Sequence, residues 1–263
     1  MRKIGGILAR SSSGESAVSR ALRVLEAFDQ YSNELSLTQL AGRTSMPVST
    51  VHRVVTELVR LGLLERRGSD LILGVRLWEV AVRAPGVFGL RETALPYLQE
   101  VNNRLQHHAQ LAILQGAEIL FLERLSRPKP VINLTSIGGR MPWYATSSGF
   151  VLLADAASEV RETVIAGPRP RYAFEPELSA KDVQQMLAQA RREGYFETRG
   201  YIHPDATAVA APIKGPYGMA VASLAVVVPT EGFLLRPVLE VLLPAAKAVS
   251  ARLAKSLLGQ DQA

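Results

Sequence analysis

The chain has 263 residues, 48% of them hydrophobic, and a formal net charge of +6. This length and hydrophobic content are sufficient for two domains with buried cores, and the modest basic excess permits nucleic-acid binding without proving it. The sequence contains no cysteine, which excludes disulfides, thiolate metal sites and therefore zinc fingers.

Residues 1–14 predict a flexible basic arm. They include Arg2, Lys3 and Arg10, but their apolar run, Ile7–Ala9, is too short for a secretory signal. No later segment supplies the roughly 20 unbroken apolar residues of a membrane span. We therefore expect a cytoplasmic protein with no membrane partner.

Residues 15–75 predict a small domain that begins with three helices. An apolar stripe at helical spacing indicates a first helix over residues 16–31. Ser36 and Gln39 fit a capping box, so a second, short helix should begin there. Pro47 suits the first turn of a third helix, because the N–H that proline lacks would have no intrahelical partner in that turn.

The third helix presents a polar face that suits DNA. Apolar residues from Val51 to Val59 recur at helical spacing, which leaves the opposite face to solvent. Taken alone, such a face is more often an ordinary solvated surface, but the order helix, turn, helix and hairpin is how a small domain places one helix in the major groove. The predicted contacts to bases and phosphates from this helix are Ser49, Thr50, His52 and Arg53.

A basic hairpin follows the third helix. Short strands at Leu63–Glu65 and Leu71–Leu73 should flank a turn over Arg66–Asp70, which is the arrangement of a wing. Arg66 and Arg67 are then placed for phosphate contact and counterion release, although two arginines in a turn can also be solubilising charges alone. The winged helix-turn-helix is the predicted DNA-binding domain.

Residues 76–89 predict a linker helix. Its helical spacing extends over Gly74–Val82, and Ala84–Gly86 should break it. A new helix is expected over Leu90–His107, where a larger domain of residues 90–260 begins.

The larger domain is predicted to be α+β with an antiparallel sheet. Alternating apolar residues and turn signals indicate the strands, and helical spacing with capping residues indicates the helices. The expected strands are 110–114, 118–125, 131–134, 206–213 and 220–228, and the expected helices are 147–154, 180–193 and 235–258.

Several short segments stand in a specific order and spacing across both domains: Met46–Arg53, Leu73–Leu77, Gly138–Pro142, Ala145–Gly149, Glu193–Tyr195 and Val209–Ile213. In these segments the chain resembles the IclR family of bacterial transcriptional regulators, over about residues 16–258. The resemblance implies a winged helix-turn-helix domain and a C-terminal GAF-like effector-binding domain. It also implies a homodimer or homotetramer that binds a palindromic double-stranded operator, with no cofactor.

The resemblance further implies a small-molecule site. In relatives whose effector is a small carboxylate, the ligand lies at the turn that reads Ser147-Ser148 here, where helix N–H groups and the helix dipole favour an anion. An alternative is that these serines only cap the helix. The other implied effector contacts are Met141, Thr198, Ala206, Ala208, Ala225 and Val227.

Three of these positions depart from the relatives. Ala208, Ala225 and Val227 carry no polar group, where carboxylate-binding relatives have several. We therefore expect a small organic acid or aromatic catabolite with an apolar body. The nearby Trp143 and Tyr144 are expected in the core rather than against the ligand.

Two other functions remain open. One is a hydrolase-like or other small-molecule enzyme whose helix-turn-helix is structural, but Ala145 stands where a G-x-S-x-G elbow needs glycine. Adjacent His107 and His108 point in different directions, which disfavours a shared metal ion. The other is a ligand sensor whose helix-turn-helix no longer binds DNA. We expect a ligand-responsive regulator that is not an enzyme and holds no metal.

Overall fold

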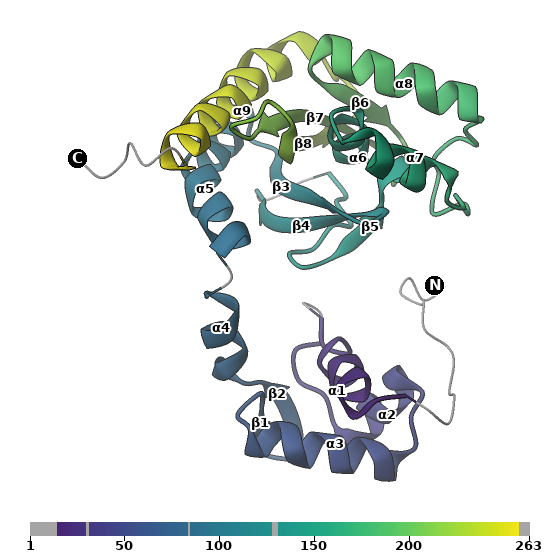
Figure 1. Ribbon diagram of the computed structural model, residues 1–263, viewed down its shortest axis with the longest axis vertical. Helices are drawn as coiled ribbons and strands as arrows, with labels where there is room; N and C mark the ends of the chain where they lie inside the picture. The colour runs from purple at the N-terminus through teal and green to yellow at the C-terminus, as the bar shows by residue number, and fades with distance from the viewer. Residues whose placement is uncertain (1–14, 30–31, 84, 128–130, 258–263) are drawn as a thin grey trace. The chain divides into compact units, whose positions relative to one another are not determined.

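The computed structural model describes residues 15–29, 32–83, 85–127 and 131–257. The chain divides between Pro85 and Gly86 into two compact units (Figure 1). The predicted basic arm lies outside the described residues. Of the helices in these ranges, none combines the length and the apolar character needed to cross a bilayer.

The N-terminal unit is a three-helix domain with a two-stranded hairpin and a following helix. Its core contains Leu40, Val51, Val55 and Leu71, all fully buried, so the apolar stripe of the third helix faces inward as predicted. The elements are α1 (Ala17–Leu25), α2 (Leu37–Thr44), α3 (Val48–Arg60), β1 (Leu64–Arg67), β2 (Asp70–Leu73) and α4 (Val75–Ala81).

Local contacts determine where α2 begins and how the chain turns from α2 into α3. The predicted capping box is present: the Ser36 hydroxyl accepts from the N–H of Gln39, and the Gln39 side chain accepts from the N–H of Ser36. Ser45 ends α2 in the left-handed conformation, with φ of 53°. Pro47 is the residue before α3 rather than in its first turn, and its carbonyl accepts from the N–H groups of Thr50 and Val51.

The first helix is shorter than predicted. It ends at Leu25, not at residue 31, and residues 30 and 31 lie outside the described ranges. The Arg43 guanidinium donates to the carbonyl of Ala27 and pairs with Asp29 at 3.0 Å. These contacts from α2 hold the segment after α1 in a non-helical path.

The wing is tighter than predicted. Arg66 pairs with Leu71 and Arg67 with Asp70 in the strand register, so both arginines lie in β1 and not in the turn. The turn is reduced to Gly68 and the residue after it, and Gly68 has a φ of 62°, which glycine adopts readily.

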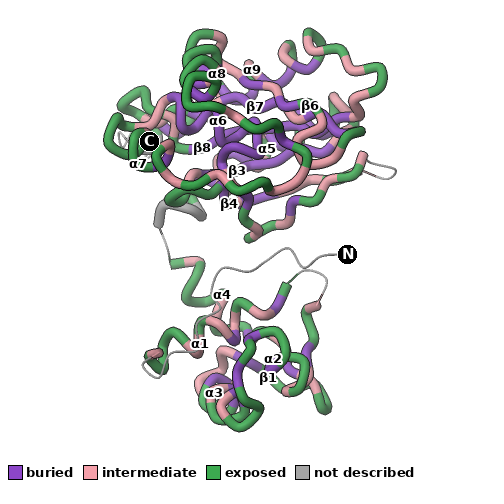
Figure 2. Tube along the Cα trace, turned by 90° about the vertical axis from the view of Figure 1, so that its right-hand side faces the viewer, coloured by how far each residue is buried: buried purple, intermediate pink, exposed green. Residues whose placement is uncertain are grey.

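The C-terminal unit is α+β, which confirms the predicted fold class. Its six-stranded antiparallel sheet has the order β5-β4-β3-β8-β7-β6, with α5 and α9 packed on one face and α6 and α8 on the other (Figures 1 and 2). The elements are α5 (Pro85–Leu105), β3 (His108–Gln115), β4 (Glu118–Leu125), β5 (Arg140–Pro142), the 3-10 helix η1 (Trp143–Ala145), α6 (Ser147–Ala154), α7 (Ser158–Ala166), α8 (Ala180–Glu193), β6 (Phe196–Arg199), β7 (Ala206–Lys214), β8 (Ala220–Pro229) and α9 (Leu235–Leu257).

The strand predicted at 131–134 is wrong. Residues 131–135, which we call the strap, form no strand; β5 occupies the edge beside β4 instead. Side chains satisfy the strap's carbonyls: the Arg124 guanidinium donates to Asn133 and Thr135, and the His108 ring lies 3.0 Å from the Val131 oxygen. These side chains supply partners to three alternate carbonyls of the strap, where a neighbouring strand would otherwise supply N–H groups.

Two further boundaries differ from the sequence-based expectation. α5 begins at Pro85 rather than at Leu90, since proline suits the first helical position. α5 ends at Leu105 rather than at residue 107, Gln106 has a φ of 58°, and β3 begins at His108 rather than at residue 110. The chain therefore reverses direction within two residues.

α7 and β6 are absent from the sequence-based expectation. α7 buries only Val164, and β6 is four residues long with Phe196 and Thr198 facing inward. Elements this short or this exposed have no clear hydrophobic period.

Candidate functional site

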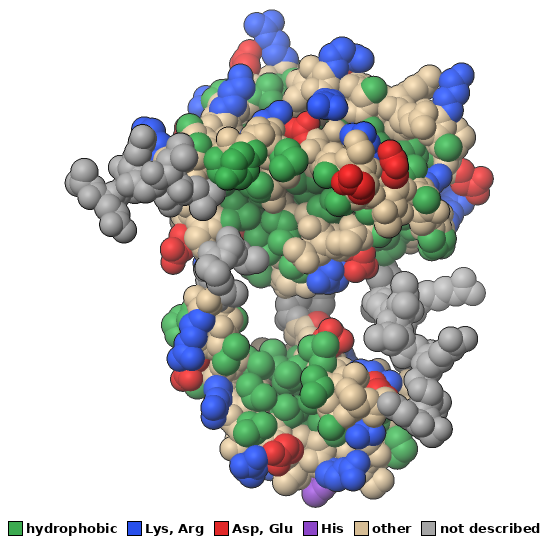
Figure 3. Space-filling view, in the orientation of Figure 1, with side chains coloured by type: hydrophobic (Ala, Val, Ile, Leu, Met, Phe, Trp, Pro, Cys, Tyr) green, Lys and Arg blue, Asp and Glu red, His purple; other side chains and the backbone are tan. Residues whose placement is uncertain are grey.

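The predicted DNA contacts of α3 lie on its water-facing side. Thr50 is half-buried and the other three are exposed, and Figure 3 shows basic side chains over this part of the unit. Among the described residues, none pairs with the Arg53 guanidinium, which leaves its donors available to a guanine edge or a phosphate. The three exposed side chains are Ser49, His52 and Arg53.

The two arginines of the wing differ in their surroundings. Both are exposed, but Arg67 pairs with Glu34 at 2.5 Å, whereas Arg66 has no such partner in the described ranges. An exposed ion pair is weak, so Arg67 can exchange it for a phosphate, at the cost of leaving Glu34 unpaired. Arg66 makes no such exchange.

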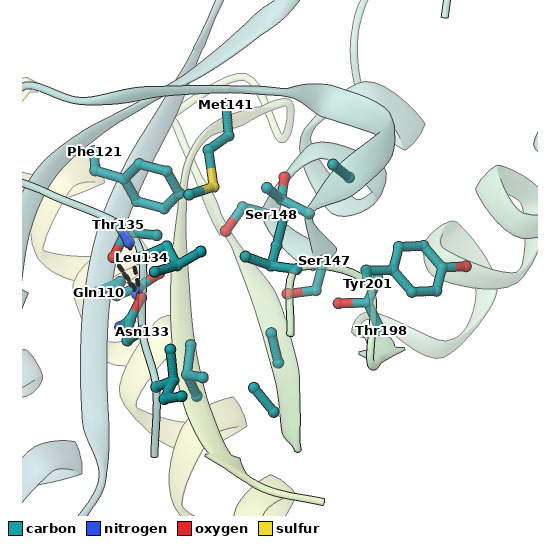
Figure 4. Close-up of a pocket in the computed structure, with 17 residues that line it drawn as sticks. Gln110, Phe121, Asn133, Leu134, Thr135, Met141, Ser147, Ser148, Thr198 and Tyr201 are labelled. Carbon is teal, nitrogen blue, oxygen red and sulfur yellow. Dashed lines mark hydrogen bonds between the residues drawn. The ribbon is translucent and has the colours of Figure 1, made fainter. Parts of the chain in front are cut away.

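The C-terminal unit contains a cavity of about 50 Å³. The strap, the start of α6, and strands β3 to β8 surround it (Figure 4). Ala225 does not line it, because its side chain packs in the core with α6. The other implied effector contacts all line it: Met141, Ser147, Ser148, Thr198, Ala206, Ala208 and Val227.

The first turn of α6 faces this cavity. Thr146 is the N-cap, and its hydroxyl accepts from the N–H of Gly149 at 3.0 Å. Ser147 and Ser148 are therefore not the caps; their N–H groups belong to the first turn, which has no intrahelical acceptors. Both residues are 2% exposed, and neither hydroxyl has a partner within the described residues.

Close packing fixes the position of α6. A Cβ at Gly149 would lie 1.9 Å from the carbonyl oxygen of Trp143, so only glycine permits this approach of helix and 3-10 helix. The Trp143 ring is edge-on to Phe150 at 5.6 Å, and Phe150 stacks on Phe196 at 4.3 Å. Trp143 and Tyr144 are buried and do not line the cavity, in agreement with the expectation that they belong to the core.

The strap contributes a polar cluster that the sequence did not reveal. Gln110 donates to the Thr135 hydroxyl at 2.7 Å, and that hydroxyl donates to the Asn133 side chain at 2.8 Å. The sequence-based expectation missed these polar groups because it assigned residues 131–134 to a strand. The polar residues at alternate positions 133 and 135 could have indicated them. The other lining residues that were not predicted are Phe121, Ile132, Leu134, Ala145, Thr146, Tyr201 and Ile202.

His108 anchors the strap from β3. Its Nε2 lies 3.0 Å from the carbonyl oxygen of Val131, and its Nδ1 lies 3.1 Å from the Ser126 hydroxyl. Because a carbonyl only accepts, Nε2 carries the proton and Nδ1 accepts from Ser126. Burial lowers the pKa of His108 below its usual range, so the ring is neutral at neutral pH.

The described part of the chain contains no group of three His, Asp or Glu side chains that could hold a metal ion. His203 lies 3.8 Å from Asp205 and forms a pair, not a ligand set.

Together, the winged helix-turn-helix and the separate α+β unit with its cavity define the class of DNA-binding regulators that carry a ligand-binding domain. Comparison with known families narrows this class. Residues 17–68 match the IclR helix-turn-helix domain, and residues 82–251 match the C-terminal domain of the bacterial transcriptional regulator IclR. The chain belongs to the IclR family.

Individual relatives agree with this assignment. An IclR homolog from Microbacterium hydrocarbonoxydans, solved in complex with 4-hydroxybenzoate, is 40% identical, with a TM-score of 0.83 over 90% of this chain and 99% of that one. The transcriptional regulator BhcR of Paracoccus denitrificans is 30% identical over 87% of this chain and 82% of its own length. The Pca regulon regulatory protein of Pseudomonas putida is 28% identical over 79% and 72%, respectively. These relatives are transcriptional regulators and not enzymes, and this chain is an IclR-type transcriptional regulator rather than a hydrolase.

Proposed function

We propose that this regulator binds a palindromic operator as a homodimer or homotetramer and senses a small organic acid with an aromatic or aliphatic body. The observation that carries the proposal is the first turn of α6, which brings unpaired N–H groups and two buried serine hydroxyls to a cavity with mostly apolar walls. The acid group binds at this turn, and the apolar body lies between the turn and the strap, in a cavity of about 50 Å³ that must widen to admit it.

The chemistry of the α6 turn favours a carboxylate. The N–H groups of Ser147 and Ser148 and the helix dipole attract an anion. The two serine hydroxyls and the hydroxyl of Thr198, which is 3% exposed, have no protein partner in the described ranges. Because these residues line the cavity, a ligand that supplies acceptors can take hydrogen bonds from their hydroxyls.

The walls favour an apolar body. Phe121, Met141 and Val227 contribute aromatic and aliphatic surface, and Ala206 and Ala208 leave space without adding polar groups. The Microbacterium relative was solved with 4-hydroxybenzoate, an aromatic acid. That ligand supports the same class of effector for this chain.

For DNA, we infer that α3 enters the major groove and that the wing contacts phosphates. Ser49, Thr50, His52 and Arg53 would read bases or fix the helix, and Arg66 and Arg67 would neutralise the backbone. Arg53→Ala and Arg66→Ala, compared with the wild type in DNA binding, distinguish this role from a helix-turn-helix that no longer binds DNA.

Pairing of two chains would place two recognition helices about one turn of DNA apart. On the N-terminal unit, Val18 and Leu22 of α1 are 78% and 53% exposed, and Figure 3 shows hydrophobic side chains gathered over α1. An exposed apolar patch on a small domain supports self-association through that surface.

Calorimetric titration with 4-hydroxybenzoate tests the pocket. The double variant Ser147→Ala/Ser148→Ala should weaken binding by about 10-fold or more, because two hydrogen bonds of roughly 1 kcal/mol each are lost. Ser158→Ala, on the exposed start of α7, is the matched control and should bind as the wild type does. Equal affinity for the double variant and the wild type would reject the α6 turn as the acid site.

A further inference from the structure

The polar cluster of the strap lies apart from the serines of α6. Figure 4 shows Gln110, Asn133 and Thr135 together on one side of the pocket and Ser147 and Ser148 on the other. A ligand whose acid group lies at α6 therefore directs its opposite end toward the strap. The hydrogen bonds within the cluster determine what that end meets.

These hydrogen bonds fix the orientation of both side-chain amides. The Asn133 oxygen accepts from the backbone N–H of Thr135 at 3.1 Å, and a backbone N–H can only donate. The Thr135 hydroxyl donates to the same oxygen at 2.8 Å, so it accepts from the amide nitrogen of Gln110 at 2.7 Å. The Asn133 nitrogen, Nδ2, and the Gln110 oxygen, Oε1, are the groups that remain.

Both remaining groups lack a partner among the described residues. Asn133 Nδ2 is fully buried and donates no hydrogen bond. Gln110 is 3% exposed, and its Oε1 accepts none. A buried amide with unused donors costs free energy, and holding the strap does not require them, because the Asn133 oxygen already makes both contacts to Thr135.

We propose that Asn133 is a specificity-determining residue, which donates through Nδ2 to a hydroxyl at the end of the effector remote from its acid group. The same hydroxyl donates to Gln110 Oε1, so the donor and the acceptor of the cluster are both used. The effector class is then a hydroxy acid with an apolar body between its two polar ends. The inference rests on the proposed function, because the acid group at α6 sets the direction of the ligand.

The test compares 4-hydroxybenzoate with benzoate, which differ only in this hydroxyl, by calorimetric titration. The wild type should bind 4-hydroxybenzoate about 10-fold more tightly than benzoate, the size expected for a hydrogen bond to a buried group. In Asn133→Ala this ratio should fall several-fold, to about 3 or less, because the Nδ2 donor is lost while Gln110 Oε1 still accepts from the hydroxyl, and the affinity for benzoate should be nearly unchanged.

Ile132→Ala is the matched control, because Ile132 lines the same cavity from the same strap and forms no side-chain hydrogen bond. It should weaken both acids equally and keep the ratio of the wild type. Thr135→Val gives a second measure: it removes the hydroxyl that orients Asn133 and Gln110 and should lower the ratio without removing either amide.

Three results would overturn the assignment. If the wild type binds the two acids equally, the hydroxyl is not recognised. If Asn133→Ala weakens both acids by one common factor, Asn133 only holds the strap. If the wild type binds neither acid, the acid effector of the proposed function is rejected together with this assignment, whereas the first two results leave the acid effector intact.

Discussion

The two candidate binding surfaces of this chain are built in opposite ways. The α3 surface is exposed, comes from residues close together in sequence, and carries unpaired positive charge. The cavity is buried, mostly apolar, and assembled from the strap, α6 and several strands. Single substitutions should therefore act on the first through local, salt-dependent contacts, and on the second through packing and desolvation.

The largest effect is expected from Gly149→Ala. The added Cβ would lie 1.9 Å from the Trp143 carbonyl, a backbone atom that cannot move alone. Either α6 or η1 must shift, which should lower the free energy of unfolding by about 3 kcal/mol or more. Denaturant unfolding measures this loss of stability. Ligand titration measures whether the shift of α6 also weakens ligand binding.

Gly42→Ala is the control for Gly149→Ala. Gly42 also lies in a helix, α2, but a Cβ there meets nothing within 4 Å. Alanine should stabilise that helix by about 0.5 to 1 kcal/mol. If Gly149→Ala has the same free energy of unfolding and the same ligand affinity as the wild type, the close packing of α6 does not position the site.

Arg53→Ala should have the next largest effect, on specific DNA binding. Loss of a bidentate base contact costs roughly 1 to 3 kcal/mol, and non-operator DNA should be affected less. Fluorescence anisotropy with an operator selected from a random duplex library measures both. Arg60→Ala on the same helix is a suitable comparison and should bind nearly as the wild type does, since Arg60 already pairs with Glu57. Unchanged operator affinity in Arg53→Ala would show that Arg53 makes no base contact, and a wild type that selects no duplex would favour a helix-turn-helix that no longer binds DNA.

Arg66→Ala should have a smaller effect that does not depend on DNA sequence. Removal of one phosphate contact should reduce the slope of log affinity against log salt by about one. Arg67→Ala should change the slope less, because Arg67 must first leave Glu34. Equal slopes for the wild type and Arg66→Ala would place the wing away from the phosphates.

The smallest effect concerns pH. Burial lowers the pKa of His108 in the folded state, so the unfolded chain binds this proton more tightly. The stability that this ring contributes is complete above its ordinary pKa of 6.5 and is lost as pH falls through the folded value. Melting temperature should decrease from about pH 7.5 to about 5.5, and His108→Gln should reduce that decrease.

His107 is the comparison for this pH effect, because burial also lowers its pKa but it has no contact with the strap. His107→Gln should also reduce the decrease in melting temperature, and it gives the size of the effect for a half-buried histidine that does not anchor the strap. If the melting temperature decreases equally with falling pH in the wild type and in His108→Gln, the neutral form of His108 does not anchor the strap.

How much the sequence predicts follows the same division between local and distant contacts. The capping box at Ser36 and the apolar stripe from Val51 depend on residues within a few positions, so their pattern sufficed. The same reasoning failed for the strap, because its backbone partners are side chains on other elements, such as Arg124 of β4 and His108 of β3. Contacts of this kind leave no local period to detect.

The candidate site shows the same contrast. The resemblance to relatives named Ser147, Ser148 and Thr198, which line the cavity, but it did not name Asn133 or Gln110. The cluster around Asn133 depends on where the strap crosses β3, which is a property of the tertiary fold. Ala225 is on the same face of β8 as Val227, but it packs with α6 in the core and does not reach the cavity, which is also a property of the tertiary fold.

If the cavity beside α6 controls the regulator, its occupation changes operator affinity. Operator binding, measured by anisotropy with and without saturating 4-hydroxybenzoate, tests this coupling. We expect operator affinity to change by about 5-fold or more, which corresponds to a coupling free energy of at least about 1 kcal/mol. The change should be lost in Ser147→Ala/Ser148→Ala. If the acid binds and operator affinity does not change, the cavity and the DNA-binding surface are not coupled.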